Sequence, residues 1–322
     1  MGRISAARRL PTTSVIAASF LLAACTQAPD MSGIASERAR PVQRYDISQA
    51  IASNGEAIVV GTQSGVTLVS HDQGKTWERQ ALGHVSLVDI AVCSDKTFIA
   101  IDHYRKLWHA DASGANWQSV GLEQPRIPIA VACSPQGGWW VAGNNATIAG
   151  SADQGKTWQV TDLGEDTQIT ALQFIDAQRV VAFGEFGLSL VSTDGGASWQ
   201  KNPPLPGEFY PYAALFRNAG EGWVSGIAGQ ILRTRDGGQT WQKQENATQL
   251  PLNRLFMHDG APFGVGNGGV VARLEGEVWR NVPYPDPLPM FLGGGASIAG
   301  QAAIVVGGPG GLLRTISTAN NK

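Results

Sequence analysis

The chain has 322 residues, with 24 Lys and Arg against 26 Asp and Glu, and a formal charge of −2. Removing residues 1–24 as an export signal takes away three arginines and no acid, so the charge becomes −5. A mildly acidic chain without a basic stretch lacks the positive charge that dominates nucleic-acid binding, so we expect no nucleic-acid partner. Charged residues at 16% and hydrophobic residues at 43% argue against disorder. The 40 Gly and 17 Pro predict many turns and therefore many short strands.

The N-terminus has the parts of a secretory signal. Arg3, Arg8 and Arg9 precede a short apolar segment over residues 15–24, and small residues lead up to Cys25. We therefore predict a lipoprotein signal peptide over 1–24, because Leu22-Ala23-Ala24-Cys25 resembles the bacterial lipobox, in which the cysteine is diacylated. The alternative is an ordinary signal peptide with a chance cysteine.

The segment after the signal predicts where the protein resides. Residues 25–40 are expected to be the lipidated Cys25 and a flexible tether. Residue 26 is Thr rather than Asp, which by resemblance to Gram-negative sorting favours the outer membrane. We expect an exported protein whose acyl chains anchor it to that membrane, facing the periplasm.

Export would leave Cys93 and Cys133 in a compartment that permits disulfides. The two residues are 40 positions apart, which matches the internal repeat described next. They are either small buried hydrophobic residues or a bridge between adjacent repeats. We favour the first interpretation, because equivalent positions in neighbouring repeats are often too far apart to bridge.

Most of the chain follows one repeat. Residues 70–77, 151–158, 192–199 and 234–241 share the pattern S/T-x-D-x-G-x-S/T-W, and residues 110–117 and 272–279 are decayed copies. The final tryptophans of the six segments are 38 to 42 residues apart. A fixed period near 40 residues indicates a repeat architecture.

The repeated residues have a structural explanation. The carboxylate can accept backbone N–H groups across a tight turn, the glycine permits a positive φ, and the tryptophan is a large plug between sheets. We therefore assign a structural role to twelve residues: Asp72, Gly74, Trp77, Asp153, Gly155, Trp158, Asp194, Gly196, Trp199, Asp236, Gly238 and Trp241.

A second repeated element precedes each tryptophan by about 15 residues. It consists of two apolar runs separated by a turn, as in residues 58–68 and 180–190, and it occurs seven times. The last copy, residues 303–313, has no following turn and tryptophan. We predict an all-β, seven-bladed β-propeller over residues 41–318, with almost no helix. An N-terminal strand at residues 41–45 would complete the last blade and close the ring.

The S/T-x-D-x-G-x-S/T-W segments resemble the Asp-box, or BNR, repeat of sialidases, some xyloglucanases and sortilin-type receptors. Period, blade count, signal and length together resemble the photosystem II stability/assembly factor-like family most. That resemblance implies a non-enzymatic scaffold that binds a membrane-protein complex during its assembly. We expect no cofactor, no bound metal and a monomer.

The alternative is a glycan-active or glycan-binding propeller similar to a sialidase. Sialidases bind the substrate carboxylate with clustered arginines and use a tyrosine nucleophile with a glutamate. Arg126-Ile127-Pro128 matches a short sialidase motif, but it follows two repeats instead of preceding the first. None of the five tyrosines has an obvious glutamate partner in sequence. We therefore expect no enzymatic activity.

Loops opposite the Asp-box turns are the best candidates for a binding surface. The hairpin turn at residues 102–106 is charged and aromatic, and the crossing at residues 202–212 holds three aromatics among four prolines. A further proline-rich crossing covers residues 283–289. The predicted partner-binding residues are Tyr104, Arg105, Arg126, Tyr210, Tyr212 and Arg254. The alternative is that these loops merely cover the face.

Overall fold

The computed structural model describes residue 2, residues 30–207 and residues 209–319, and the chain divides into two compact units, 1–40 and 41–322. The predicted signal peptide, apart from residue 2, and Cys25 lie outside the described residues. In the first unit, α1 (Ser32–Ala39) occupies part of the segment predicted to be a flexible tether. The good helix formers lie in its second half, from Ala35 to Ala39, and an ion pair between Glu37 and the C-cap residue Arg40 adds support. Within the described part of the chain, no helix has the length and apolar character needed to cross a bilayer.

The second unit contains seven sheets, antiparallel except for one edge pair, which we number as blades in chain order. Blades 1 to 3 consist of β1 (Ser48–Ser53), β2 (Ile58–Thr62), β3 (Val66–Ser70), β4 (Glu78–Ala81), β5 (Leu87–Val92), β6 (Phe98–Asp102), β7 (Lys106–Ala110), β8 (Gln118–Gly121), β9 (Pro128–Cys133), β10 (Trp139–Gly143), β11 (Thr147–Ser151) and β12 (Gln159–Asp162). Blades 4 and 5 consist of β13 (Ile169–Phe174), β14 (Val180–Gly184), β15 (Ser189–Ser192), β16 (Gln200–Lys201), β17 (Pro211–Phe216), β18 (Gly222–Gly226), β19 (Ile231–Thr234) and β20 (Gln242–Lys243).

Blades 6 and 7 depart from the four-stranded pattern. They consist of β22 (Leu252–His258), β23 (Ala261–Gly266), β24 (Val271–Glu275), β25 (Val278–Asn281), β26 (Gly294–Ser297), β27 (Ala303–Gly307) and β28 (Leu313–Ser317). Blade 6 gains a parallel edge strand, β21 (Glu245–Asn246), whereas blade 7 has three strands. Short 3-10 turns stand at four hairpin tips: η1 (Asn144–Ala146), η2 (Glu185–Gly187), η3 (Ile227–Gly229) and η4 (Asn267–Gly269).

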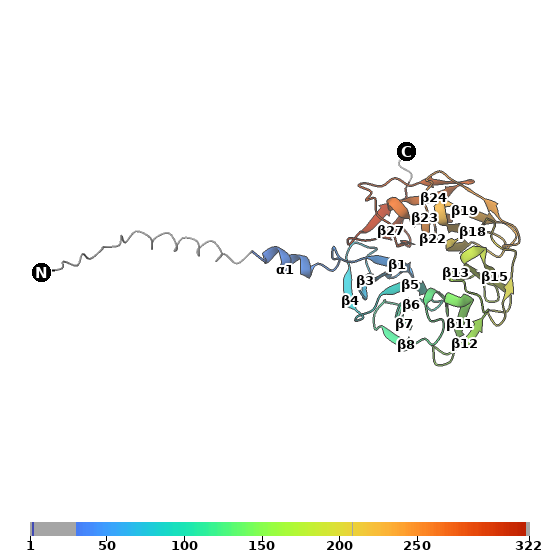
Figure 1. The fold of residues 1–322 in the computed structure, drawn as a ribbon. Coiled ribbons are helices and arrows are strands. Elements are labelled where there is room, and N and C mark those ends of the chain that lie inside the picture. The colour runs from blue at the N-terminus through green and yellow to red at the C-terminus, as the bar shows by residue number, and fades with distance from the viewer. Residues whose placement is uncertain (1, 3–29, 208, 320–322) are drawn as a thin grey trace. The chain divides into compact units, whose positions relative to one another are not determined.

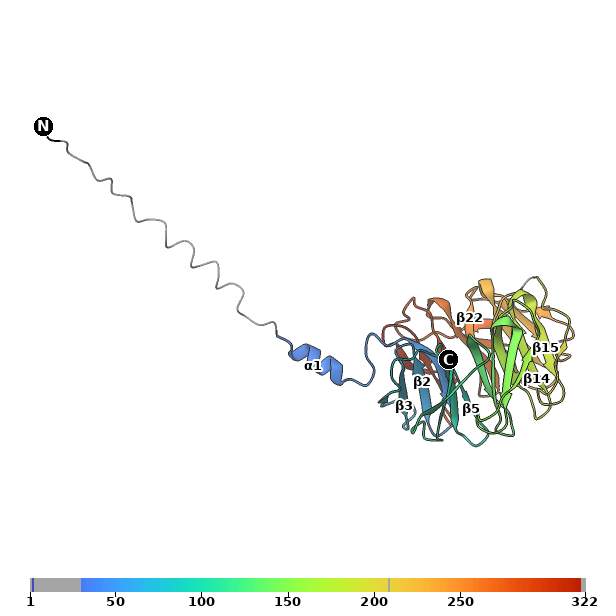
Figure 2. The same ribbon diagram turned by 60° about the horizontal axis from the view of Figure 1, so that its bottom comes forward.

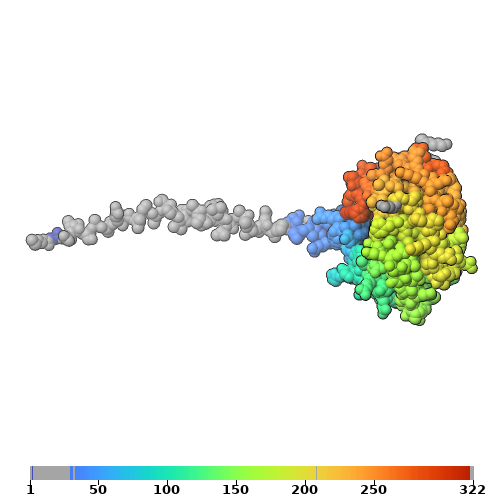
Figure 3. Space-filling view, turned by 45° about the vertical axis from the view of Figure 1, so that its right-hand side comes forward, coloured from blue at the N-terminus to red at the C-terminus, as the bar shows by residue number. Residues whose placement is uncertain are grey.

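The blades form a closed ring, which confirms the predicted seven-bladed propeller (Figure 1). The first strand of each blade contacts the first strand of the next, and β26 of blade 7 contacts β1 of blade 1. All seven predicted hairpins are paired as β2–β3, β6–β7, β10–β11, β14–β15, β18–β19, β23–β24 and β27–β28. The turned view shows the strands running through the thickness of the ring, and the space-filling view shows successive blades following one another around its side (Figures 2 and 3).

The strand predicted to complete the last blade is not formed. Residues 41–47 are irregular, and the first strand begins at Ser48 as the innermost strand of blade 1. The segment nevertheless joins the two ends of the ring, because Gly311 N–H donates to the Asp46 carbonyl (2.9 Å) and Val42 packs on the core shared by blades 7 and 1. The guanidinium of Arg79 in blade 1 in turn donates to both carboxylate oxygens of Asp46, at 2.7 and 3.0 Å. Side-chain packing and loop contacts therefore close the ring without a fourth strand.

The six repeat tryptophans lie at the interfaces between blades. Each packs into the core that its own blade shares with the preceding blade. Trp279, for example, is fully buried beside Trp223 and Ile231 of blade 5. Burying one large aromatic side chain at each of six interfaces removes much apolar surface from water, which stabilises the ring.

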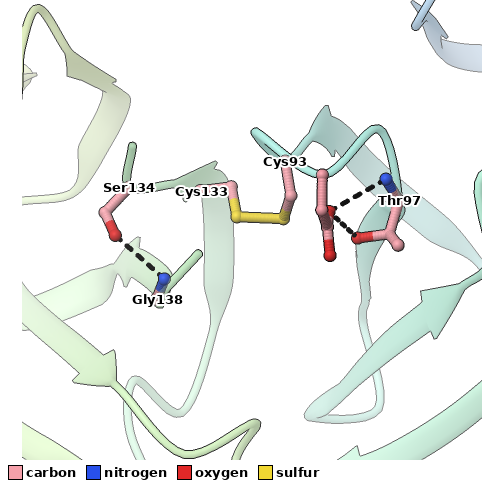
Figure 4. Close-up of a disulfide and its surroundings, with 6 residues drawn as sticks. Cys93, Thr97, Cys133, Ser134 and Gly138 are labelled. Carbon is pink, nitrogen blue, oxygen red and sulfur yellow. Dashed lines mark hydrogen bonds between the residues drawn. A yellow bond between two sulfur atoms is a disulfide. The ribbon is translucent and has the colours of Figure 1, made fainter. Parts of the chain in front are cut away.

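Cys93 and Cys133 form a disulfide between blades 2 and 3, with a Cα–Cα distance of 5.0 Å (Figure 4). The favoured interpretation as two unbridged hydrophobic residues is therefore wrong. Cys93 directly follows β5 and Cys133 ends β9, and both are innermost strands that contact one another. Adjacent blades are closest near the ring axis, so this equivalent pair lies within bridging range.

Candidate functional site

The loops of the ring form two faces. We call tip face the one made by the hairpin turns between second and third strands and by the crossings between blades. These loops bond to one another, as when Leu122 N–H donates to the Arg105 carbonyl (2.8 Å) and Ile227 N–H to the Tyr210 carbonyl (3.0 Å). The box face carries the Asp-box turns and the turns after each first strand, which are joined by bonds such as Gly195 N–H to Gln178 O (2.7 Å).

The carboxylates of the box face are occupied within their own turns. Asp72 accepts the backbone N–H and the hydroxyl of Thr76 at 2.8 and 2.6 Å, and also the Ser70 hydroxyl at 2.9 Å. The Thr76 hydroxyl and backbone bonds lower the pKa of Asp72 to about 2. The same pattern holds the pKa of Asp153, Asp194 and Asp236 at about 2. These carboxylates stay ionised as turn acceptors, which makes them poor acid–base catalysts at neutral pH.

The tip face carries the exposed apolar side chains of the ring. Among the described residues of the propeller, nine large hydrophobic residues are exposed, and only Val160, on the outer strand β12, lies elsewhere. The eight on the tip face are Tyr45, Tyr104, Ile127, Phe186, Ile227, Leu250, Leu288 and Phe291. They come from loops of several blades, and loops carried by a rigid scaffold are where binding residues usually lie, so this face is the candidate interaction surface.

Two hairpin tips present these side chains most fully. Tyr104 is 64% exposed and Phe186 is 71% exposed. Buried Asp102 fixes the first tip, because it accepts the N–H groups of Tyr104 (2.7 Å) and Lys106 (3.0 Å) and the indole N–H of Trp108 (2.8 Å). Phe186 is held in the left-handed region at φ 57°, where it points away from the core of blade 4. Both aromatics therefore stand on constrained backbone, which limits the entropy that binding would cost.

The structure separates the six predicted partner-binding residues into four places, of which the central channel is described next. Tyr104 and Arg105 form the exposed tip of blade 2, and Arg126 is exposed on the crossing into blade 3. Tyr210 and Tyr212 pack edge to face, with their ring centres 5.8 Å apart, where the crossing enters blade 5. Their neighbour Phe209, grouped with them in the sequence, is buried in the core between blades 4 and 5.

Arg254 lies in the central channel, together with Tyr212. The channel holds a cavity of about 210 Å³ lined by residues of all seven innermost strands. Six of these strands contain a β-bulge at the same position: Gln49, Val88, Ile129, Thr170, Tyr212 and Asn253. Bulges leave backbone groups outside the ladder, where other groups can reach them.

The guanidinium of Arg254 uses those carbonyls. It donates to the bulge carbonyls of Val88 (3.3 Å) and Gln49 (3.5 Å) and lies 3.4 Å from the carboxylate of Asp89. Burial raises the pKa of Asp89, while the charge of Arg254 opposes that rise. Asp89 also accepts the N–H of Val131 at 3.1 Å. Arg254 is thus occupied with structural contacts to blades 1 and 2.

One feature of the glycan alternative is present and another is missing. Burial, and then the nearby hydrogen-bonded Glu185, raise the pKa of Tyr210, so a tyrosine–glutamate pair exists that the sequence did not suggest. However, Arg254 is the single arginine among the residues that line the channel cavity, and it already donates to backbone carbonyls and lies beside Asp89. A lone guanidinium does not provide the cluster that would bind a sialic acid carboxylate.

Several residues of the tip face escaped the sequence analysis. Phe186, Ile227 and Phe291 look like ordinary apolar residues of a repeat, and only their placement on loops shows that they are exposed. In the channel, Asp89 was also not predicted, because it follows a bulge, which no sequence pattern marks.

Within the described parts of the chain, no group of three or more His, Cys, Asp or Glu side chains could hold a metal ion.

Residues 109–219 match the family model described as Photosynthesis system II assembly factor YCF48, and residues 68–79 match the BNR/Asp-box repeat. The chain is 29% identical over 138 residues to a photosystem II assembly lipoprotein Ycf48 of Synechococcus sp. CC9902, which covers 41% of this chain and 40% of that protein. It is 23% identical over 250 residues to the photosystem II stability/assembly factor HCF136 of Arabidopsis thaliana, a match that covers 69% of this chain and 62% of that protein. The matches therefore span about two fifths to three fifths of these curated relatives. The chain resembles this family, as its repeats predict.

Solved structures show the same fold. YCF48 from Cyanidioschyzon merolae superposes with a TM-score of 0.70 at 17% identity, covering 87% of this chain and 98% of that one. The structure titled YCF48 bound to D1 peptide has a TM-score of 0.69 at 15% identity, covering 87% of this chain and 93% of that one. Virginiamycin B lyase from Staphylococcus aureus has a TM-score of 0.73 at 12% identity, covering 85% of this chain and 95% of that one. The fold is therefore shared by assembly factors and by an enzyme, so it does not by itself decide between the two classes.

Proposed function

We propose that this chain is a non-enzymatic, membrane-anchored scaffold that binds a segment of a membrane-protein complex and acts in its assembly or stability. The observation that carries the proposal is the apolar bias of the tip face, where eight of the nine exposed large hydrophobic residues in the described propeller lie. The likeness to photosystem II assembly factors supports it, and one structure similar in fold is titled as bound to D1 peptide.

The anchor and the binding face form part of the same proposal. Relatives of this chain are named lipoproteins, which supports acylation of Cys25 and export. We place the protein in the outer membrane on the residue after Cys25, as a monomer whose tip face remains available to the partner. The structural contacts of Arg254 with backbone carbonyls and the low pKa of the Asp-box carboxylates favour scaffolding over catalysis.

The test is a crosslinking pull-down from native membranes, with mass spectrometry of the recovered proteins. The variant Tyr104→Ala/Arg105→Ala/Phe186→Ala removes three exposed side chains, and Val160→Ala is the matched control outside the tip face. We expect one membrane complex to be recovered with the wild type and with Val160→Ala, and about 10-fold less with the triple variant. Equal recovery with the triple variant, with an unchanged melting temperature, would refute the tip face as the binding surface.

The glycan alternative predicts a different result. Binding or hydrolysis of sialosides that is lost in Arg254→Met and kept in the triple variant would place function in the channel. That outcome would replace the scaffold proposal.

A further inference from the structure

The ring has seven interfaces between blades but six repeat tryptophans. Trp77, Trp117, Trp158, Trp199, Trp241 and Trp279 each fill the interface between their own blade and the preceding one. The core between blades 6 and 7 contains no tryptophan among the described residues. In the residues that the structure describes, β28 is the last strand of blade 7, and no Asp-box turn or fourth strand follows it to supply one.

The interface without a tryptophan is hollowed. Two cavities of about 210 and 240 Å³ share Phe263, Arg273 and Thr318. We call this region the blade 6–7 cleft, defined by Phe263, Arg273, Glu275, Asn281, Ser317 and Thr318. The unpaired edge of β28 borders it, since β27 is the strand with which β28 pairs in the described ring. An edge strand beside an open groove can accept a further strand.

The preceding interface shows how a filled cleft is arranged. Arg233 on β19 pairs across the sheet with Trp223 and lies 5.4 Å from the centre of its ring. It donates to both carboxylate oxygens of Glu277 of blade 6, at 2.8 and 2.7 Å, and also binds Glu221. Glu277 stands two residues before Trp279, the tryptophan that plugs this interface. The acidic and the aromatic residue therefore come from nearby positions of the next blade, with Glu277 in the turn before β25 and Trp279 on β25.

Arg273 holds the equivalent position in blade 6 without these partners. It pairs across the sheet with Phe263 and lies 5.7 Å from the centre of that ring, 40 residues after Arg233. Ala261 replaces Glu221, and the described part of blade 7 has no fourth strand that could carry a counterpart of Glu277. Arg273 makes no hydrogen bond or ion pair within the described part of the chain, and its Nε is buried.

The nearby acidic groups have other partners. Glu275 lies 3.8 Å from Arg280, and Asp259 lies 3.5 Å from His258. His258 is buried, with its ring nitrogens bonded to the hydroxyls of Ser297 (2.8 Å) and Thr318 (2.7 Å). The cleft thus offers an unpaired cation on an aromatic ring, hydroxyls and an open strand edge.

We propose that the blade 6–7 cleft binds an extended segment of a partner protein in which a carboxylate precedes an aromatic residue by two positions. The aromatic side chain would fill the place of the seventh tryptophan, and the carboxylate would pair with Arg273 as Glu277 pairs with Arg233. The backbone of the segment would add to the half of β28 that ends at Ser317. The other half is covered, because Arg314 donates to the carbonyls of Pro285 (3.0 Å) and Asp286 (2.9 Å). This site shares no residue with the tip-face set and does not depend on the proposed function.

The protein's own blade 6 supplies the probe. A labelled peptide with the sequence of residues 274–282, LEGEVWRNV, contains Glu277 and Trp279 at the required spacing. We expect saturable 1:1 binding to the folded propeller by fluorescence anisotropy. Peptides carrying Glu277→Gln or Trp279→Ala should each bind at least about 10-fold more weakly, because a charge-assisted bond or the aromatic plug is lost.

Three protein variants make the test specific. Arg273→Gln removes the cation and should weaken binding about 10-fold or more. Arg280→Gln removes the neighbouring exposed arginine and is the matched control, expected to bind like the wild type. Ala261→Glu restores the carboxylate that blade 5 has at residue 221, so it should pair with Arg273 internally and compete with the peptide.

Two results would overturn the proposal. One is the absence of saturable binding to a wild type whose circular dichroism and melting are normal. The other is equal affinity of the wild type, Arg273→Gln and Ala261→Glu, which would mean that the peptide binds elsewhere.

Discussion

Arg254 of blade 6 and Asp89 of blade 2 meet in the central channel at 3.4 Å, although 165 residues separate them in the chain. The guanidinium also caps bulge carbonyls of blades 1 and 2, and the carboxylate accepts a backbone N–H of blade 3. Four blades are therefore joined through one charge pair at the ring axis. Both side chains are largely buried, at 28% and 18% exposure, so removing one partner leaves the other poorly solvated.

Replacing Arg254 by Met should destabilise the ring by about 2–3 kcal/mol, because Asp89 and two carbonyls lose their partner. The loss should grow with pH. Burial already raises the folded-state pKa of Asp89 above 3.8, and removing Arg254 raises it further. A raised carboxyl pKa means that the folded state binds protons more tightly, so stability falls as pH rises through that range. Urea unfolding at pH 4 and pH 7 measures the difference, and an equal loss at both would contradict this account.

The Asp-box turns predict the acid limit of the fold. Asp72, Asp153, Asp194 and Asp236 have folded-state pKa values of about 2, below the usual 3.8. A lowered carboxyl pKa adds stability above the unfolded value, and that stability is lost as pH falls from about 4 to 2. The denaturation midpoint should drop steeply over this window. Asp72→Asn should flatten the profile, and an unchanged slope would show that other groups control acid unfolding.

The disulfide between Cys93 and Cys133 should be a major stabilising element. It closes a loop of about 40 residues, for which the chain-entropy relation gives about 4 kcal/mol. The variant Cys93→Ala/Cys133→Ala, or reduction of the wild type, should therefore lower the melting temperature. Thiol titration of the unfolded, unreduced protein checks the bridge directly, because free Cys93 and Cys133 would contradict it.

The interface tryptophans should dominate packing stability. Trp279 is fully buried, so Trp279→Ala should cost about 3–5 kcal/mol through lost burial and a residual cavity. The exposed Phe186 provides the contrast, since Phe186→Ala should change stability by less than about 0.5 kcal/mol. Chemical denaturation of both variants measures this, and similar costs at the two sites would contradict the assignment of Trp279 as a plug.

The proposed anchor predicts a change of cell fraction. Cys25→Ser removes the thiol that we propose is acylated, so the protein should move from the membrane pellet to the soluble periplasmic fraction. Density-gradient separation of the wild type tests the outer-membrane assignment in the same experiment. Retention of Cys25→Ser in the membrane would mean that another segment, or a partner, holds the protein there.

The amino-acid sequence predicted the fold because its signals are local. Each Asp-box turn and each hairpin depends on residues within about ten positions of one another. The period near 40 residues shows where each blade begins along the chain and therefore how many blades there are. The binding face was harder to predict. Tyr104 stood out as a bulky departure from the repeat, whereas Phe186 had the character of a core residue and proved to be exposed.

Sequence alone determined the repeat, the number of blades, the turn chemistry and the absence of a tryptophan from the last blade. Only the tertiary structure decided that Cys93 meets Cys133, that Arg254 meets Asp89, and that Arg273 is left beside an open cleft. The physical reason is ring closure. Closing the ring brings innermost strands together around one axis and sets blade 6 against an incomplete blade 7, and no local pattern in the chain encodes those distances.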